Sequence, residues 1–217
     1  MLQVLIQYHY LLLQGFLTTI KLLGCIMLIG IPFGILLGVI GGRYSKEIFT
    51  FIKGARFITK VIPVLVFLFW LHYPLQGLLG IVIDPFWTTI FTRGLLNTTA
   101  VASIVSSELE LLPKAYREAG TTLNLSPNQI IRYIELPLLF RRTIPQLLLI
   151  QASMLEYTLF ASLISVPELF KTAQSINAMI YKPVEIYSLL IFFFLIILGP
   201  LHLLIKWLDK KYVAQYD

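Results

Sequence analysis

The chain has unusually little charge for a protein of its length. Of its 217 residues only 13% are Asp, Glu, Lys or Arg, whereas 58% are hydrophobic. An ordinary soluble domain carries roughly 25% charged residues. This composition excludes a soluble globular domain, and we expect a polytopic membrane protein.

The sequence also has little that could support catalysis. Cys25 is the one cysteine, so no disulfide can form within the chain, and its place in an apolar run favours a packing role. The histidines His9, His72 and His202 are too far apart for metal-ligand spacing. There is no P-loop, so the chain cannot hydrolyse ATP by that machinery. No serine or cysteine has a plausible base and orienting acid, which makes an intramembrane enzyme a poor interpretation.

Long apolar stretches are abundant. A helix needs about 20 mainly apolar residues to cross a bilayer. Five stretches meet this need, and we predict spans at Phe16–Ile40, Arg56–Tyr73, Phe86–Ser107, Thr143–Val166 and Ile186–Leu208. A bent connection from Pro74 to Asp84 follows the second span, and Met1–Gln14 either lies at the membrane interface or extends the first. The predicted fold class is an all-α membrane protein, with residues 1–217 forming a single transmembrane domain.

Glycines recur at short intervals in the first predicted span. Gly24, Gly30, Gly34 and Gly38 are spaced six, four and four residues apart. Small residues at four-residue spacing let two helix backbones approach closely in lipid. The spacing therefore predicts a close helix contact, although ordinary glycine enrichment in membrane helices is nearly as good an explanation.

The basic residues are concentrated in three regions that flank the predicted spans. Thirteen fall there: Arg43, Lys46, Lys53, Arg56 and Lys60; Lys114, Arg117, Arg132, Arg141 and Arg142; and Lys206, Lys210 and Lys211. The intervening connections hold only Lys171 and Lys182. Because cytoplasmic loops are enriched in Lys and Arg, we predict that the N-terminus is outside and the C-terminus is cytoplasmic. Such scattered charges do not form a nucleic-acid footprint.

One long polar stretch, Glu118–Pro137, interrupts the apolar chain. Ser126, Pro127 and Gln129 have the spacing of a capping box with proline in the first helical turn. We therefore predict a helix from Pro127 to Glu135, ended by Leu136-Pro137 because proline disfavours helical geometry in the residue before it.

A second short helix is predicted just before, at Pro113–Leu123. An ordered, mixed-charge segment between membrane spans is typical of contact with a soluble partner. The alternative is a solvated loop that contains a turn.

The residues of this stretch resemble the EAA motif of permease subunits of bacterial ABC importers. The motif reads E-A-A, three residues, Gly, nine residues and I-x-L-P. It is matched without a gap by E-A-G at 118–120, Asn124 and I-E-L-P at 134–137. Gly120 and Asn124 depart from the motif. Asn tolerates a left-handed backbone better than most residues, so we expect the turn at Asn124 to survive.

The likeness is strongest to the polar amino-acid branch of that family. It is carried by P-F-W at 85–87, L-P-K at 112–114, R-R at 141–142 and S-V-P-E-L at 165–169. Three stretches depart from the branch pattern, namely K-V-I-P at 60–63, S-S-E at 106–108 and E-Y-T at 156–158. The resemblance thus leaves the transported solute open.

The resemblance implies a type I importer permease in the bacterial inner membrane, taking up a polar amino acid or similar small solute. Its partners would be ATP-binding subunits, a second permease subunit and an extracytoplasmic solute-binding protein. ATP and Mg would lie on the ATP-binding subunit, with no cofactor on this chain. The cytoplasmic coupling loop would span residues 108–137. Its implied ATPase-coupling residues are Arg117, Glu118, Ala119, Gly120, Asn124, Leu125, Leu136 and Pro137.

Two other function classes fit the sequence less well than a permease. A stand-alone channel or ion-coupled carrier usually needs repeated spans or intramembrane ionisable relays. Five spans cannot divide into two equal repeats, and only Arg93 and Glu156 lie well inside predicted spans. A purely structural assembly subunit would leave the capped polar segment without a role.

Arg93 and Glu156 should lie at similar depths, about 12 and 15 Å below the outer ends of their spans. One interpretation is a structural Arg93–Glu156 pair. The other is that they line the solute path together with Tyr157 and Thr158, Arg93 meeting a solute carboxylate and Glu156 a solute amine.

Overall fold

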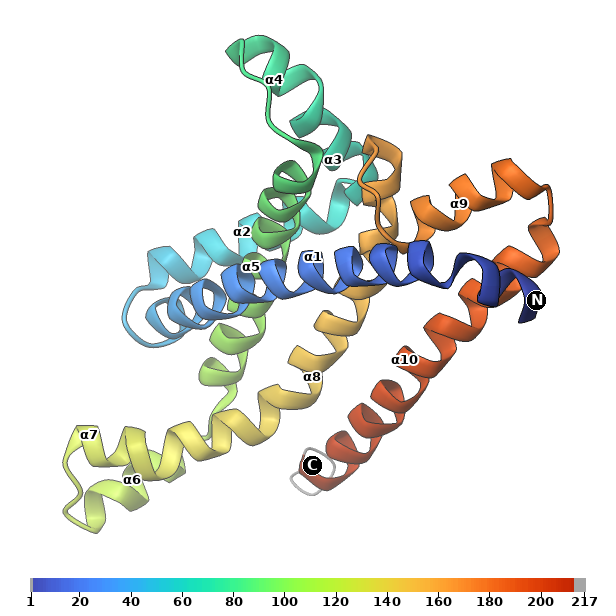
Figure 1. Cartoon of the computed structure of the whole chain (residues 1–217). Coiled ribbons are helices and arrows are strands. Elements are labelled where there is room, and N and C mark those ends of the chain that lie inside the picture. The colour runs from blue at the N-terminus through green and yellow to red at the C-terminus, as the bar shows by residue number, and fades with distance from the viewer. Residues whose placement is uncertain (1, 213–217) are drawn as a thin grey trace.

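The computed structural model describes residues 2–212, which form helices and, within that range, no strand. The long helix α1 (Leu2–Arg43) runs beside α5 (Pro85–Leu111), which in turn packs against α8 (Leu136–Tyr157). Helix α10 (Pro183–Tyr212) lies next to α8 on its other side (Figure 1). The predicted all-α fold class is confirmed.

Fewer stretches qualify as membrane spans by length and composition than the five predicted. Within residues 2–212, three helical stretches are long and apolar enough to cross a membrane: α1, Pro127–Ile164 and α10. Helices Lys46–Val61 and Val64–Leu79 give a fourth if the bent pair is one span. Helix α5 is long enough to cross a membrane, but its composition is too polar for it to be counted with these stretches. The five predicted spans therefore stay a prediction.

The second predicted span is broken in its middle. Helix α2 (Lys46–Val61) ends at Val61, and the stretch Val64–Leu79, which begins with α3 (Val64–His72), lies at 94° to it. Ile62 has an extended backbone because Pro63 excludes the helical conformation from the residue before it. The span predicted over Arg56–Tyr73 is therefore not one continuous helix.

The connection predicted from Pro74 to Asp84 is partly helical. Proline 74 begins the short helix α4 (Pro74–Leu79), which ends at Gly80 with a left-handed backbone, φ 64°. Asp84 then caps α5 through a hydrogen bond from the Phe86 amide, 2.8 Å.

The N-terminal residues extend the first span. Helix α1 is continuous from Leu2 to Arg43, and Val4 and Leu12 are buried against α9 (Leu169–Ile180) and α10. Of the two alternatives for Met1–Gln14, the structure supports the extension, with Met1 itself outside the described residues. Val4 and Leu12 thus anchor this extension to the C-terminal half of the chain.

The glycine spacing of α1 does produce a close helix contact. A Cβ added at Gly30 would lie 2.4 Å from Asn97 Nδ2, and one at Gly34 would lie 2.5 Å from Val101 Cβ. At Gly38 the nearest atom would be Val105 Cβ, 2.7 Å away. The prediction is confirmed for these three positions. It is wrong for Gly24, where the same construction meets nothing within 4 Å.

The polar stretch folds into two short helices. Helix α6 (Lys114–Thr122) matches the helix predicted at Pro113–Leu123. Ser126 and Gln129 form the predicted capping box at the start of α7 (Pro127–Ile130). A π-helix, η1 (Ile131–Glu135), continues from α7 directly into α8.

The expected helix end at Leu136-Pro137 was wrong. Leu136 is helical, with φ −59° and ψ −48°, and its amide donates to the Ile131 carbonyl five residues back. The wider π turn accommodates the proline ring, which would clash with a carbonyl in a regular helix. One unbroken helical stretch therefore leads from the polar segment to Ile164, because the 3-10 helix η2 (Thr158–Ile164) follows α8.

Candidate coupling surface and translocation pocket

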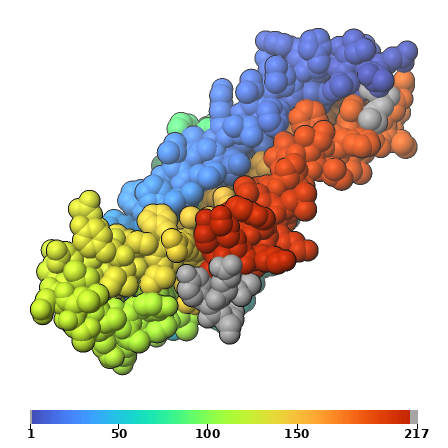
Figure 2. All heavy atoms as spheres, turned by 90° about the horizontal axis from the view of Figure 1, so that it is seen from below, coloured from blue at the N-terminus to red at the C-terminus, as the bar shows by residue number. Residues whose placement is uncertain are grey.

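Helices α6 and α7 form a projection at one end of the molecule. In Figure 1 they lie far from the N-terminus and from α9, and in Figure 2 the yellow-green residues protrude at the same end. Most side chains between Lys114 and Gln129 are exposed. The projection is thus open to a partner over much of its surface.

A buried carboxylate fixes the projection to the rest of the chain. Glu135 is only 3% exposed and lies in η1. Its Oε1 accepts from Arg117 Nε of α6 at 2.5 Å, and its Oε2 is bonded to Arg43 at the end of α1. Charge-assisted contacts of this kind are about twice as strong as neutral hydrogen bonds. Arg117 is therefore held within the chain, and the coupling residues around it have a defined orientation.

The two departures from the EAA motif are explained by local packing. Gly120 is buried, and an added Cβ would lie 2.8 Å from Ile130 Cγ1. An alanine there would require Ile130 to move. Asn124 adopts the predicted left-handed conformation, with φ 54°, so it can replace the glycine that is usual at this turn.

The remaining predicted coupling residues face outward to different degrees. Glu118, Ala119, Asn124, Leu136 and Pro137 are exposed, and Leu125 is half-buried. Within residues 2–212, no hydrogen bond or ion pair engages the Glu118 carboxylate. The same projection also exposes Leu123, 72%, a large apolar side chain that α6 leaves uncovered.

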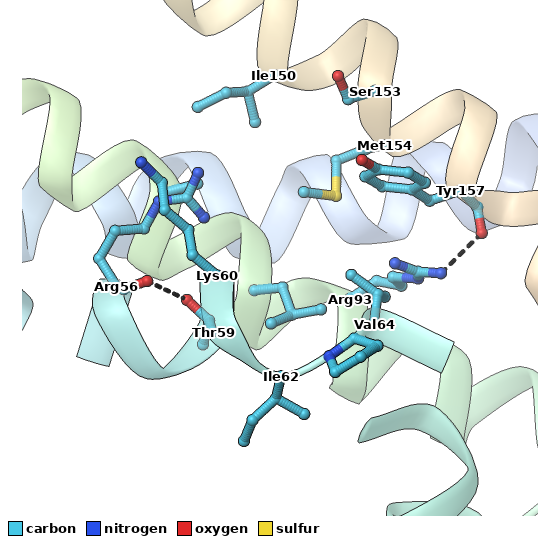
Figure 3. Close-up of a pocket in the computed structure, with 13 residues that line it drawn as sticks. Arg56, Thr59, Lys60, Ile62, Val64, Arg93, Ile150, Ser153, Met154 and Tyr157 are labelled. Carbon is cyan, nitrogen blue, oxygen red and sulfur yellow. Dashed lines mark hydrogen bonds between the residues drawn. The ribbon is translucent and has the colours of Figure 1, made fainter. Parts of the chain in front are cut away.

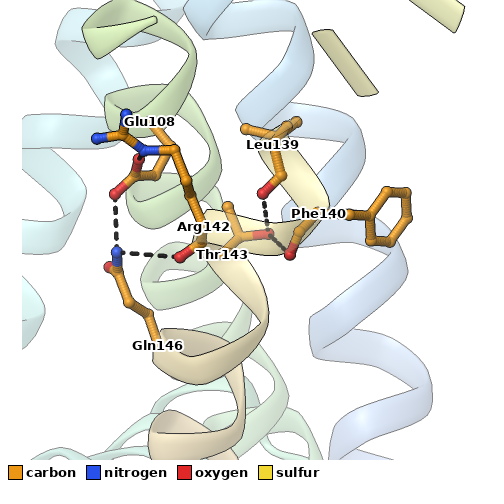
Figure 4. A network of polar contacts seen from close by, with 6 residues as sticks. All are labelled: Glu108, Leu139, Phe140, Arg142, Thr143 and Gln146. Atoms are coloured by element: carbon orange, nitrogen blue, oxygen red, sulfur yellow. Dashed lines mark hydrogen bonds and ion pairs between the residues drawn. The ribbon is translucent and has the colours of Figure 1, made fainter. Parts of the chain in front are cut away.

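A second polar cluster joins α5 to α8 and was not identified from the sequence. Glu108 accepts from Arg142 Nε at 2.9 Å and from Gln146 Nε2 at 2.7 Å (Figure 4). The four-residue spacing of Arg142 and Gln146 places both on one face of α8. That spacing was a usable signal, but nothing in the sequence indicated Glu108 as the partner.

Arg93 occupies the interior of the chain. It is 0% exposed, and its Nη2 donates to the Tyr157 carbonyl at 2.9 Å. The guanidinium carbon lies 5.2 Å from the Tyr157 ring centroid and 5.5 Å from that of Phe160. Nε and Nη1 have no hydrogen-bond partner within residues 2–212. A buried arginine with free donors is able to bind an anion.

The predicted structural pair of Arg93 with Glu156 is not formed, and that interpretation was wrong. Glu156 is exposed on the outer face of α8, while Arg93 binds the backbone and ring of Tyr157 instead. Adjacent residues of a helix point about 100° apart, so Glu156 and Tyr157 cannot both face Arg93. Thr158 is buried and donates to the Leu155 carbonyl at 2.7 Å.

A pocket of about 300 Å³ brings α2, α3, α5 and α8 together at Arg93. Tyr157 and Met154 contribute from α8, and Arg56 and Lys60 contribute from α2 (Figure 3). In Figure 3 the Arg56 and Lys60 side chains lie together on one side and Tyr157 lies above Arg93 on the other. The sequence prediction treated Arg56 and Lys60 only as orientation signals and missed them as pocket residues, because the break at Pro63, which also lines the pocket, was not predicted.

Deeper in the bundle, Asn97 and Gln151 connect α5 and α8. Asn97 Nδ2 donates to Gln151 Oε1 at 3.0 Å, and Gln151 Nε2 donates back to Asn97 Oδ1 at 3.1 Å. Asn97 is fully buried and is the side chain against which Gly30 packs. The reciprocal bonds satisfy two polar groups that would be costly in an apolar interior.

Comparison with known proteins places these features in a family. Residues 30–213 match the family described as "Binding-protein-dependent transport system inner membrane component". The glutamine transport system permease protein GlnP of Escherichia coli is 29% identical over 86% of this chain and 87% of its own length. The L-cystine transport system permease protein TcyB of Bacillus subtilis is 36% identical over 54% of this chain and 49% of its own.

Solved structures show the same fold. The structure titled "Crystal structure of an amino acid ABC transporter with histidines" has a TM-score of 0.83 at 19% identity, covering 95% of this chain and 96% of that chain. An inward-facing structure of the MetNI methionine ABC transporter has a TM-score of 0.64 at 20% identity, covering 96% and 97%. With the family match extending over most of its length, the chain belongs to the inner-membrane components of binding-protein-dependent transport systems.

Proposed function

We propose that the chain is the transmembrane permease subunit of an ATP-driven importer for a polar amino acid or a similar small solute. The family match and the amino-acid permeases among its relatives support this function. The chain would form the solute path, and a partner subunit would bind ATP and Mg and hydrolyse the nucleotide. The chain itself would be neither an ATPase nor a cofactor-binding subunit.

One observation supports the proposal most strongly, namely the ordered projection of α6 and α7, whose outer face is exposed. Two contacts fix α6 in place. Arg117 pairs with Glu135, and Gly120 packs against Ile130. Glu118 and Leu123 then point outward, one with a carboxylate free to accept and one with an exposed apolar side chain. A rigid projection of this kind can transmit a displacement from a docked ATP-binding subunit to α8, with which it is continuous.

The assembly would contain further subunits. A second permease, identical or different, would complete the path, and an extracytoplasmic binding protein would deliver the solute. The Lys and Arg distribution supports an N-terminus outside and a C-terminus in the cytoplasm, with the 108–137 loop on the cytoplasmic side. A reporter that is active only outside the cytoplasm, fused after Lys211, should be inactive, and activity there would overturn this orientation.

The solute path would include the pocket at Arg93. Its free Nε and Nη1 and the neighbouring Tyr157 are suited to a solute carboxylate. Thr158 would support α8 from the interior. Glu156 faces outward and is not among the residues lining this pocket, so its contact with a solute amine would need the partner subunit or another conformation.

The test is the Glu118→Ala variant. We expect the ATP-binding subunit that co-purifies with the chain to bind about tenfold or more weakly, because a hydrogen bond to a charged group contributes about 1.5–3 kcal/mol. Asp209→Ala removes another exposed carboxylate, near the end of α10, and is the matched control. Equal binding by the two variants, with the same transport rate, would argue against coupling through Glu118.

A further inference from the structure

The pocket between α2, α3, α5 and α8 carries unbalanced positive charge. Arg56, Lys60 and Arg93 line it, and no aspartate or glutamate is among its described lining residues. Across residues 2–212, no ion pair neutralises any of the three. With a volume of about 300 Å³, the pocket is at the lower end of the range of small-molecule sites.

This arrangement does not serve the stability of the chain. Like charges in one pocket disfavour one another, and an ionisable side chain among membrane helices is costly unless it is paired or faces water. Arg93 makes the cost larger, since it is completely buried and keeps two nitrogen atoms without an acceptor. A ligand with negative charge would supply both the missing charge and the missing acceptors.

We propose that this pocket binds a solute of net negative charge through its carboxylate groups. The proposal rests on the permease function above and specifies its solute class. A zwitterion would present one carboxylate to three cations and place its ammonium group among them. A dicarboxylate or an acidic amino acid leaves less positive charge uncompensated, and a cationic solute would be repelled.

The three cations differ in how accessible they are. Lys60 is exposed and Arg56 is half-buried, so both are accessible in this conformation. Arg93 is covered, with Tyr157 and Met154 beside it in the pocket lining, and its free N–H groups would meet the solute after one of these side chains moves. Arg56 and Lys60 thus add to the attraction for an anion, and Arg93 provides unpartnered N–H donors for one carboxylate.

Binding to the purified full-length chain tests the charge preference directly. In nanodiscs of neutral phosphatidylcholine at fixed ionic strength, the probes are succinate, glutamate, glutamine and arginine. We expect affinity to fall in that order, with at least about tenfold between glutamate and its neutral isostere glutamine, as expected for one charge-assisted contact. Glutamine or arginine binding as tightly as glutamate, or no binding by either anion, would overturn the proposal.

Variants of α2 identify the site without disturbing the buried arginine. Arg56→Gln and Lys60→Gln should each weaken succinate binding about tenfold and weaken glutamine binding by a smaller factor. Lys53→Gln is the control, since Lys53 lies on the same helix but outside the pocket, 3.6 Å from Glu110. The same loss in all three variants would contradict a specific site.

An anionic lipid headgroup could offer the same chemistry, so the binding is repeated with phosphatidylglycerol in the nanodisc. Retained succinate binding is expected. If phosphatidylglycerol abolishes succinate binding and Lys60→Gln restores it, the pocket binds a lipid headgroup and the solute proposal is overturned. These measurements need no ATP-binding subunit, so their failure would leave the permease function standing.

Discussion

Single carboxylates connect the elements of this membrane protein at positions where their partners come from distant parts of the sequence. Glu135 joins α6 to α1 through Arg117 and Arg43, and Glu108 joins α5 to α8 through Arg142. Both acids are mostly buried. A buried acid that has two partners holds two elements in one arrangement, because removing it leaves charged donors unsatisfied.

Glu135→Ala should loosen the 108–137 loop. The variant loses two charge-assisted bonds. We expect each loss to lower the free energy of unfolding by at most about 1.5–3 kcal/mol. Glu110→Ala is the control, because its 3.6 Å contact with Lys53 is exposed on both sides and such pairs contribute about 0–1 kcal/mol. Thermal unfolding of the detergent-solubilised chain measures both, and an equal effect of the two substitutions would contradict the role of Glu135.

Glu168 gives the chain a pH-dependent contact. It lies between η2 and α9, outside the candidate spans, is 0% exposed, and caps α9 by accepting from the Phe170 and Lys171 amides at 2.8 and 2.7 Å. Burial raises the pKa of Glu168 to about 7 from an ordinary 4.5, more than the two backbone hydrogen bonds lower it. The folded chain therefore binds a proton that the unfolded chain releases at pH 5 to 7.

The sign of the pH effect follows from this difference. Below pH 4.5 both states are protonated, and between pH 4.5 and 7 the unfolded state alone loses the proton, so stability should fall as pH rises and level off above 7. Glu168→Gln removes the titration and still offers an oxygen to the α9 amides. The difference in unfolding midpoint between wild type and variant should change from pH 4.5 to pH 7.5, and a constant difference would refute the assignment.

Residue-scale features were predictable where the signal was local. The capping box at Ser126 and the left-handed Asn124 depend on neighbours within a few positions, and both are confirmed. The Arg93–Glu156 pair depended on side-chain direction across two helices, which span depth alone does not determine. Arg56 and Lys60 were counted as loop charges because the bend that turns them inward was not predicted.

At the scale of elements, proline decided two boundaries in opposite ways. Pro63 breaks α2 from α3, whereas Pro137 is accommodated within the stretch from η1 to α8 by a π turn. A helix end was predicted before Pro137 and none before Pro63, the reverse of what the structure has. The difference lies in the backbone just before each proline, which the sequence pattern did not reveal.

The α1–α5 contact offers a test with an internal control. Gly34→Ala would place a methyl group 2.5 Å from Val101 Cβ, and overpacking of this kind costs about 1–3 kcal/mol. Gly24→Ala on the same helix meets nothing within 4 Å and should be neutral or stabilising by up to about 1 kcal/mol. The unfolding midpoints of the two variants decide the matter, and equal midpoints would mean that the helices are not in close contact at Gly34.

At the scale of the whole molecule, the all-α architecture and the family were both accessible from the sequence. Low charge and long apolar runs predicted the membrane fold, and the E-A-G to I-E-L-P spacing predicted the family. The number of spans was not settled in the same way. Polar residues of α5 such as Thr92, Arg93 and Asn97 are buried among the other helices. They lower the mean hydropathy of α5, so a hydropathy criterion does not detect a helix that lies inside the bundle.

The central claim is that this chain moves solute only when a partner hydrolyses ATP. The most direct measurement is uptake of a radiolabelled amino-acid mixture by vesicles that contain the chain, its co-purifying ATP-binding subunit and the solute-binding protein. Uptake should require ATP and the ATP-binding subunit, and Glu118→Ala should abolish most of it while Asp209→Ala does not. Uptake by vesicles that contain the chain alone, driven by an imposed ion gradient, would contradict the account and support a stand-alone carrier.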